Sequence, residues 1–98
     1  MLHIKFCPYC KEYGAVGVWR CAEGETLILQ CDECDALWRD PLNLDNNNAL
    51  GVMSKDYRLA ELPCPIYGGK AGWATWDDVA KTGWTKYVAG EGKALGET

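Results

Sequence analysis

The sequence has little of what most enzymes and membrane proteins require. It has one histidine, His3, and it contains neither a Gly-rich phosphate-binding loop nor an HExxH motif. A nucleophilic cysteine normally needs a positioned histidine, and His3 is the only candidate. No apolar run approaches the roughly 20 residues that span a membrane. The first residues also lack the basic and apolar segments of a secretory signal. We therefore expect a cytoplasmic protein that is not an enzyme and contacts no membrane.

Basic charge is scarce as well. The 98 residues include 14 Asp and Glu but 10 Lys and Arg, which gives a formal net charge of −4 and an isoelectric point near 4.8. Neutralising phosphates supplies most of the non-specific affinity for nucleic acid, so this balance argues against nucleic acid as a partner. Acidic surfaces suit a basic protein instead. The charge therefore favours a protein partner.

Cysteine, by contrast, is abundant, with six in the chain. Cys7-Pro8-Tyr9-Cys10 and Cys31-Asp32-Glu33-Cys34 form two Cys-x2-Cys pairs with 20 residues between them. This spacing is typical of a structural zinc site, and in a reducing cytosol paired cysteines indicate metal or redox chemistry. We predict one structural Zn²⁺ bound by Cys7, Cys10, Cys31 and Cys34. Four protein ligands would leave no position for a catalytic water.

The same cysteines allow two rival interpretations. CPYC is the dithiol motif of glutaredoxins, and Ile4-Lys5-Phe6 before it reads like their first strand. A redox CPYC needs a helix directly after it to lower the thiol pKa, whereas Gly14 and Gly17 interrupt a helix here. The four sulfurs could also hold iron. A dithiol oxidoreductase and a rubredoxin-like electron carrier therefore stay as alternatives to zinc.

The remaining candidate ligands are Cys21, Cys64 and His3. We expect the two cysteines to be small buried hydrophobic residues. Either of them, or His3 near the first pair, could replace a ligand in the tetrahedron. The ordinary interpretation of His3 is an exposed or hydrogen-bonded side chain near a terminus.

The pattern of residues predicts a small α+β protein. Residues 16–21, 26–30 and 36–39 read as three strands of an antiparallel zinc ribbon within residues 1–40. Residues 41–98 are expected to form an extension, with a polar loop and a short helical segment that packs on the ribbon as part of one domain. Thr75 is a candidate N-cap before an apolar stripe, and Gly83 is a break within it. The aromatic residues expected in the core are Trp19, Trp38, Trp73, Trp76 and Trp84.

The stretch CPYC…CDECDALW, from Cys7 to Trp38, resembles a group of small bacterial zinc-ribbon proteins. The later Trp76…Gly83-Trp84…Tyr87 is similar to their C-terminal helical segment. Such proteins look like immunity proteins that bind and block secreted bacterial toxins. The resemblance therefore implies that the protein partner is a toxin domain, and the acidic charge of the chain favours a basic one.

Acidic side chains near the predicted hairpin tip and the second cysteine pair could plug a basic cleft of such a partner. The candidates are Glu23, Glu25, Asp32, Glu33 and Asp35. A nucleic-acid- or transcription-associated zinc ribbon is the alternative function from a different class.

Overall fold

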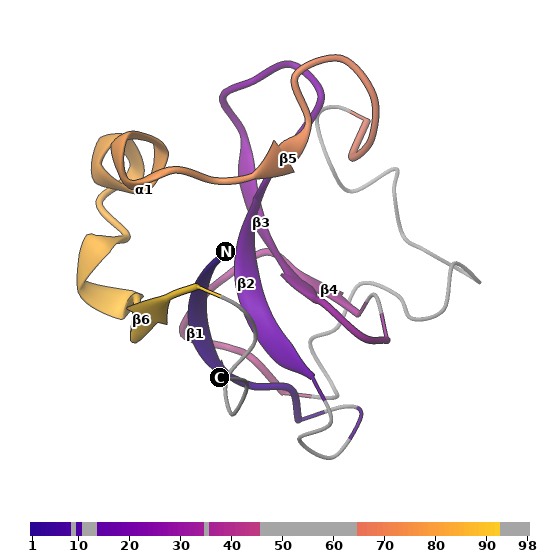
Figure 1. The fold of residues 1–98 in the computed structure, drawn as a ribbon, viewed down its shortest axis with the longest axis vertical. Helices are drawn as coiled ribbons and strands as arrows, with labels where there is room; N and C mark the ends of the chain where they lie inside the picture. The colour runs from indigo at the N-terminus through magenta and orange to yellow at the C-terminus, as the bar shows by residue number, and fades with distance from the viewer. Residues whose placement is uncertain (9, 11–13, 35, 46–64, 93–98) are drawn as a thin grey trace.

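The computed structural model describes residues 1–8, 10, 14–34, 36–45 and 65–92. Within these ranges an antiparallel sheet of six strands packs against one short α-helix (Figure 1). The strands are β1 (Leu2–Phe6), β2 (Ala15–Arg20), β3 (Leu27–Cys31), β4 (Leu37–Trp38), β5 (Gly72–Trp73) and β6 (Gly90–Glu91). The helical segments are α1 (Trp76–Thr82) and the 3-10 helix η3 (Thr85–Tyr87). This combination fits the predicted α+β class.

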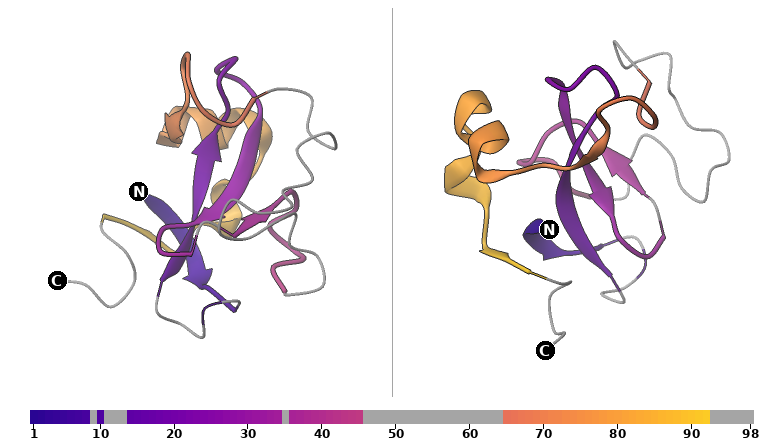
Figure 2. Two further views of the ribbon diagram at one scale, coloured as in Figure 1. Left: turned by 90° about the vertical axis from the view of Figure 1, so that its right-hand side faces the viewer. Right: turned by 45° about the horizontal axis from the view of Figure 1, so that its top comes forward.

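Strand β2 is the centre of the sheet. The strand order is β4-β3-β2-β1-β6, and β5 also pairs with β2. One edge of β2 pairs with β3 from Val16 to Arg20. Its other edge is shared, because β1 pairs with its first half and β5 with Trp19 and Arg20. Figure 2 shows the β2–β3 hairpin as the long central ribbon, with the segment that contains β5 beside its turn. Segments that are distant in sequence therefore complete one sheet.

The prediction of a three-stranded sheet was wrong. The three predicted strands exist, each within one residue of its expected ends. Three more join them among the described residues, namely β1, β5 and β6. The last two contain two residues each, which is too short for a periodic pattern to indicate a strand. Because β5 and β6 come from the predicted extension, the sheet crosses the proposed boundary at residue 40, and the division into a module and an extension stays a prediction.

The register of β2 and β3 separates two apolar clusters. Val18 pairs with Leu29, and both belong to a large cluster that includes Val79 of α1. The next pair, Trp19 and Ile28, points to the opposite face, because side chains alternate along a strand. There Ile28 packs with buried residues from β4 and from the segment before β5. Both faces of the hairpin are thus covered, one of them by α1.

The tryptophan prediction holds only in part. Trp38 is fully buried, and Trp19, Trp73 and Trp84 are half-buried. Trp76 is 44% exposed, so its assignment to the core was wrong. It is the first residue of α1, and its indole N–H donates to the Glu91 carboxylate at 3.0 Å. The apolar stripe predicted from Trp76 onward therefore begins with a surface residue.

The helix ends follow the sequence signals. The Thr75 hydroxyl accepts a hydrogen bond from the Asp78 amide, and the Asp78 carboxylate accepts one from the Thr75 amide. This reciprocal arrangement is a capping box. Gly83 ends the helix with a φ of 77°, in the left-handed region that favours glycine. The predicted start at Thr75 and the predicted break at Gly83 are confirmed.

Candidate metal centre

The two cysteine pairs meet at one end of the sheet, where β1 and β3 end and β2 begins. Cys7 directly follows β1, and its amide donates to the Gly14 carbonyl at 2.9 Å. Cys31 is the last residue of β3, and the neighbouring Asp32 amide donates to the Ala15 carbonyl at 3.1 Å. The pairing of β2 with both neighbours therefore brings together cysteines that are more than 20 positions apart.

The four sulfur atoms form a compact group. The Sγ atoms of Cys7, Cys10, Cys31 and Cys34 all lie within 4.8 Å of one another. The Cys7–Cys34 separation is 3.8 Å and the Cys10–Cys31 separation is 3.7 Å. A tetrahedron with Zn–S bonds of about 2.3 Å has S···S edges of about 3.8 Å. The four cysteines, none of which forms a disulfide, could therefore hold a metal ion.

Backbone groups of the second cysteine pair support the sulfurs. The Glu33 amide donates to Cys31 Sγ at 3.4 Å, a contact that stabilises negative charge on that sulfur. The Cys31 amide donates to the Ala36 carbonyl at 2.9 Å and closes the turn. These bonds shape the turn that carries the second pair of sulfurs.

Gly14 and Asp32 hold the two sides of the site together. The Asp32 carboxylate accepts a hydrogen bond from the Ala15 amide at 2.8 Å. A Cβ atom on Gly14 would lie 2.8 Å from Cys31 Sγ and 2.7 Å from Cγ of Glu33, so only glycine fits. The sequence offered no direct signal for either role, because both depend on how β2 approaches the second pair.

Burial differs among the four cysteines. Cys7 and Cys31 are completely buried and Cys34 is 9% exposed, whereas Cys10 is half-buried. Desolvation raises the pKa of Cys31, and it raises the pKa of Cys34 to about 11. Burial also acts against ionisation of Cys10, but hydrogen bonds from the Cys7 and Cys31 thiols outweigh it and lower the pKa of Cys10. A metal ion would have to displace protons from the buried thiols on binding.

The other candidate ligands lie elsewhere. His3 is buried in β1, and the imidazole packs so close to Gly90 that a Cβ there would lie 2.9 Å from Nε2. Cys21 is buried in the apolar cluster on the other face, in agreement with its predicted role as a small hydrophobic residue. Neither belongs to the four-sulfur group. Cys64 lies outside the described residues.

Two of the predicted partner-binding acids serve local structure. The Glu23 carboxylate accepts hydrogen bonds from the amides of Glu25 and Thr26 and from the Thr26 hydroxyl, and so closes the β2–β3 turn. The Asp32 carboxylate is bonded to the Ala15 amide. Glu25 and Glu33 are exposed. Asp35 lies outside the described residues.

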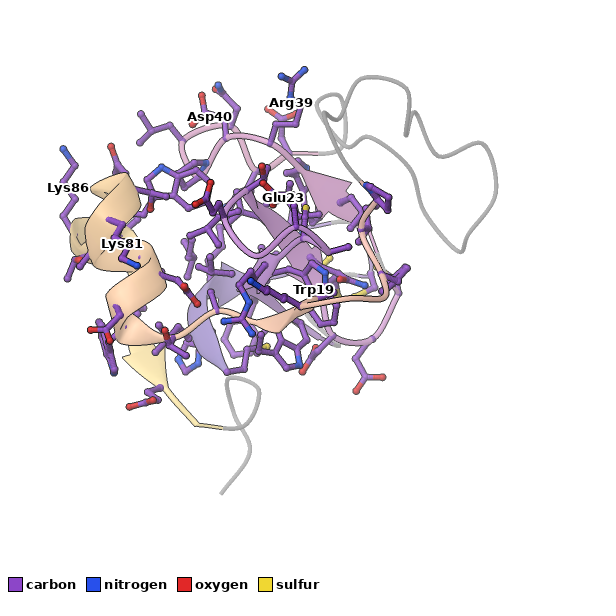
Figure 3. The ribbon with its side chains drawn as sticks, turned by 90° about the horizontal axis from the view of Figure 1, so that it is seen from above. Trp19, Glu23, Arg39, Asp40, Lys81 and Lys86 are labelled. Carbon is purple, nitrogen blue, oxygen red and sulfur yellow. The ribbon has the colours of Figure 1, made fainter. Side chains whose placement is uncertain are left out.

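The structure does not bring these acids into one patch. Glu23 and Glu25 lie in the β2–β3 turn, and Asp32 and Glu33 lie beyond the far end of β3. Five strand residues separate the two groups, a length of about 16 Å. Figure 3 looks down on the turn and shows Glu23 there, with Lys81 and Lys86 on the helical segments to one side.

A polar hollow beside the turn was not foreseen from the sequence. It has a volume of about 230 Å³ and lies between the β2–β3 turn and α1. Its lining residues are Gly24, Glu25, Asp78, Lys81 and Thr82. Glu25 thus lines a concave surface, whereas Glu33 lies beside the four-sulfur group.

Comparisons with known proteins identify a relative but no function. No family model matches the chain, and no solved structure matches it. An uncharacterized protein of Acanthamoeba polyphaga mimivirus is 30% identical over 66 residues, which is 63% of this chain. The chain spans about half the length of that relative, 53%. In the part of the chain that the structure describes, no helix is long and apolar enough to cross a membrane.

Proposed function

We propose that this chain is a zinc-stabilised protein-binding module with one structural Zn²⁺ on Cys7, Cys10, Cys31 and Cys34. The observation that carries the proposal is the sulfur geometry. Sγ separations of 3.7 and 3.8 Å match the edge of a zinc–sulfur tetrahedron, about 3.8 Å long. With four protein ligands the ion stabilises the fold and performs no catalysis.

The early start of β2 after the CPYC motif favours zinc over the dithiol alternative. Strand β2 begins at Ala15, and its start is bonded to Asp32 of the second pair. A helix long enough to lower the pKa of a redox thiol does not fit before that strand. The second pair would also have no role in a dithiol enzyme. Iron would use the same four sulfurs, so metal analysis must distinguish zinc from iron.

The proposed partner is a basic protein, and the resemblance to immunity proteins makes a toxin domain the first one to test. The net charge of −4 and the exposed carboxylates of Glu25 and Glu33 support this choice. Acidic groups at a rim steer a basic partner and accelerate association more than they strengthen the final complex.

The metal is tested by native mass spectrometry of the purified chain. One Zn²⁺ per chain is expected, with loss of binding in Cys7→Ser. Cys21→Ala is the matched control, because it removes a buried cysteine from the other face of the sheet and should keep the ion. Iron in the wild-type protein, or no metal, would overturn the zinc assignment.

The partner is tested by affinity capture of the tagged, zinc-loaded chain from its native cytosol. A single basic polypeptide at equal stoichiometry, whose activity the chain blocks, is expected. Recovery of nucleic acid or of transcription proteins, with salt-sensitive binding to oligonucleotides, would instead support the nucleic-acid alternative.

A further inference from the structure

The four cysteines differ in how easily a reagent can reach them. Cys7 and Cys31 have no exposed surface and Cys34 has 9%, whereas Cys10 is half-buried. The Gly14 backbone approaches Cys31 so closely that an added Cβ would lie 2.8 Å from its sulfur. A soluble oxidant or alkylating agent therefore meets Cys10 before the other three.

The sulfur of Cys31 lies close enough to Cys10 to react second. Cys10 Sγ lies 3.7 Å from Cys31 Sγ, which comes from the other cysteine pair. The remaining two sulfurs, of Cys7 and Cys34, are 3.8 Å apart and buried. Attack at Cys10 would thus leave an intact, shielded pair behind.

From this asymmetry we infer that Cys10 is the modification site at which hydroperoxides open the metal centre, with Cys31 as the thiolate that completes the reaction. The inference rests on the proposed zinc site. Its substrate class is small peroxides such as hydrogen peroxide, which act on accessible thiolates.

The reaction balances without any further reactant. The Cys10 thiolate attacks one peroxide oxygen, the O–O bond breaks, and hydroxide leaves while Cys10 becomes a sulfenic acid. The Cys31 thiolate then attacks the Cys10 sulfur, forms the S–S bond and displaces a second hydroxide. Two thiolates lose two electrons in total, and one peroxide is reduced to two hydroxides. Only the Cys7 and Cys34 thiolates would remain as ligands, and two sulfurs would bind a zinc ion too weakly to retain it.

The disulfide would join the same two chain segments that the metal joins. Cys10 belongs to the first pair and Cys31 to the second, so the ends of β1 and β3 would stay connected after the ion leaves. A dithiol reductant together with Zn²⁺ would restore the original site. The centre would thereby release its metal in response to peroxide without separating the two strands.

The test uses the zinc-loaded full chain and sub-stoichiometric hydrogen peroxide. Released zinc is followed with a chromogenic chelator, and cysteines are mapped by mass spectrometry after alkylation without reduction. The expected result is one zinc released per peroxide consumed, with Cys10–Cys31 as the first disulfide. A first disulfide between any other two cysteines, Cys7 and Cys10 included, or retention of zinc after Cys10 is oxidised, would overturn the inference.

Two variants make the assignment specific. Peroxide should release zinc from Cys10→Ser at least roughly tenfold more slowly than from the wild-type protein. It should release zinc from Cys21→Ala at the wild-type rate. If Cys10→Ser does not bind zinc, the wild-type protein is treated with a limiting amount of N-ethylmaleimide instead. Cys10 is then expected to be the first residue labelled. A wild-type chain without zinc contradicts the proposed function before peroxide is added, whereas a zinc-loaded chain labelled first elsewhere contradicts only the inference.

Discussion

At the scale of single residues, Gly14 sets how closely the start of β2 approaches the second cysteine pair. A Cβ there would lie 2.8 Å from both Cys31 Sγ and the Asp32 carboxylate. We expect Gly14→Ala to weaken zinc binding and to lower the free energy of unfolding by about 1 to 3 kcal/mol, because the added methyl forces the pair aside. Chelator competition and thermal unfolding measure the two effects.

Gly72→Ala is the matched control for Gly14→Ala. Its Cβ would meet only Arg20 Nη2, at 3.7 Å, which is ordinary contact, and so both measured quantities should stay near wild type. If Gly14→Ala binds zinc as tightly as this control does, the close approach of the Gly14 backbone is not required for the site.

Asp78 links α1 to β2 through charge. Burial opposes ionisation of its carboxyl group, but hydrogen bonds from the Thr75 amide and hydroxyl and from Arg20 Nη1 at 2.7 Å outweigh this desolvation and lower the pKa of Asp78. The side chains of Asp78 and Arg20 are only 16% and 25% exposed. We expect Asp78→Asn to cost about 1 to 3 kcal/mol at neutral pH, because charge-assisted bonds are lost.

The lowered pKa of Asp78 determines how the stability lost in Asp78→Asn varies with pH. A carboxylate whose folded pKa is depressed contributes fully above its unfolded value of about 3.9 and loses its contribution as the pH falls through the folded pKa. The difference between wild type and Asp78→Asn in urea unfolding should therefore be constant above about pH 5 and shrink below 3.9. Asp77→Asn removes an exposed carboxylate from the same helical turn and is the matched control. A constant difference between wild type and Asp78→Asn down to pH 3 would contradict the role of Asp78.

At the scale of elements, the proposed zinc ion would join the ends of β1 and β3. Removing zinc with a chelator should open this end first, because binding of a structural ion also stabilises the segments that carry its ligands. Hydrogen exchange should accelerate at the amides of Cys7, Cys31 and Asp32, which are bonded at the metal end. The Ala74 amide, which donates to the Val18 carbonyl under α1, should keep its protection longer. Equal acceleration at all four amides would mean that the ion stabilises the whole chain uniformly.

The elements also show what the sequence could and could not predict. The strand at 27–31 can be predicted from the sequence, because a run of β-favouring residues there lies between a turn signal and a cysteine pair. The capping box at Thr75 is likewise a local pattern. Strands β5 and β6 are set by their partners Trp19 and Leu2–His3, which no local pattern reveals. The structural role of Asp32 could not be predicted from a local pattern either, because it depends on a contact with Ala15.

At the scale of the whole molecule, the distribution of charge matters more than its total. The five predicted acids include two that hold turns, and the exposed pair Glu25 and Glu33 lies at opposite ends of β3. Glu25 lines the hollow beside α1, whereas Glu33 borders the metal centre. A basic partner that docks on one end would use only one of them. Single charge reversals can therefore identify which end is the interface.

Glu25→Lys and Glu33→Lys should differ in their effect on association with the captured partner. We expect the reversal at the interface to lower the association rate about tenfold at low salt, with a smaller change in dissociation, because steering acts during the encounter. Stopped-flow mixing at two salt concentrations measures this, and added salt should reduce the difference. Asp77→Lys makes the same charge change on the exposed surface of α1 and is the control. Equal slowing in all three variants would attribute the effect to net charge alone, and unchanged rates in all three would rule out acidic steering of the partner.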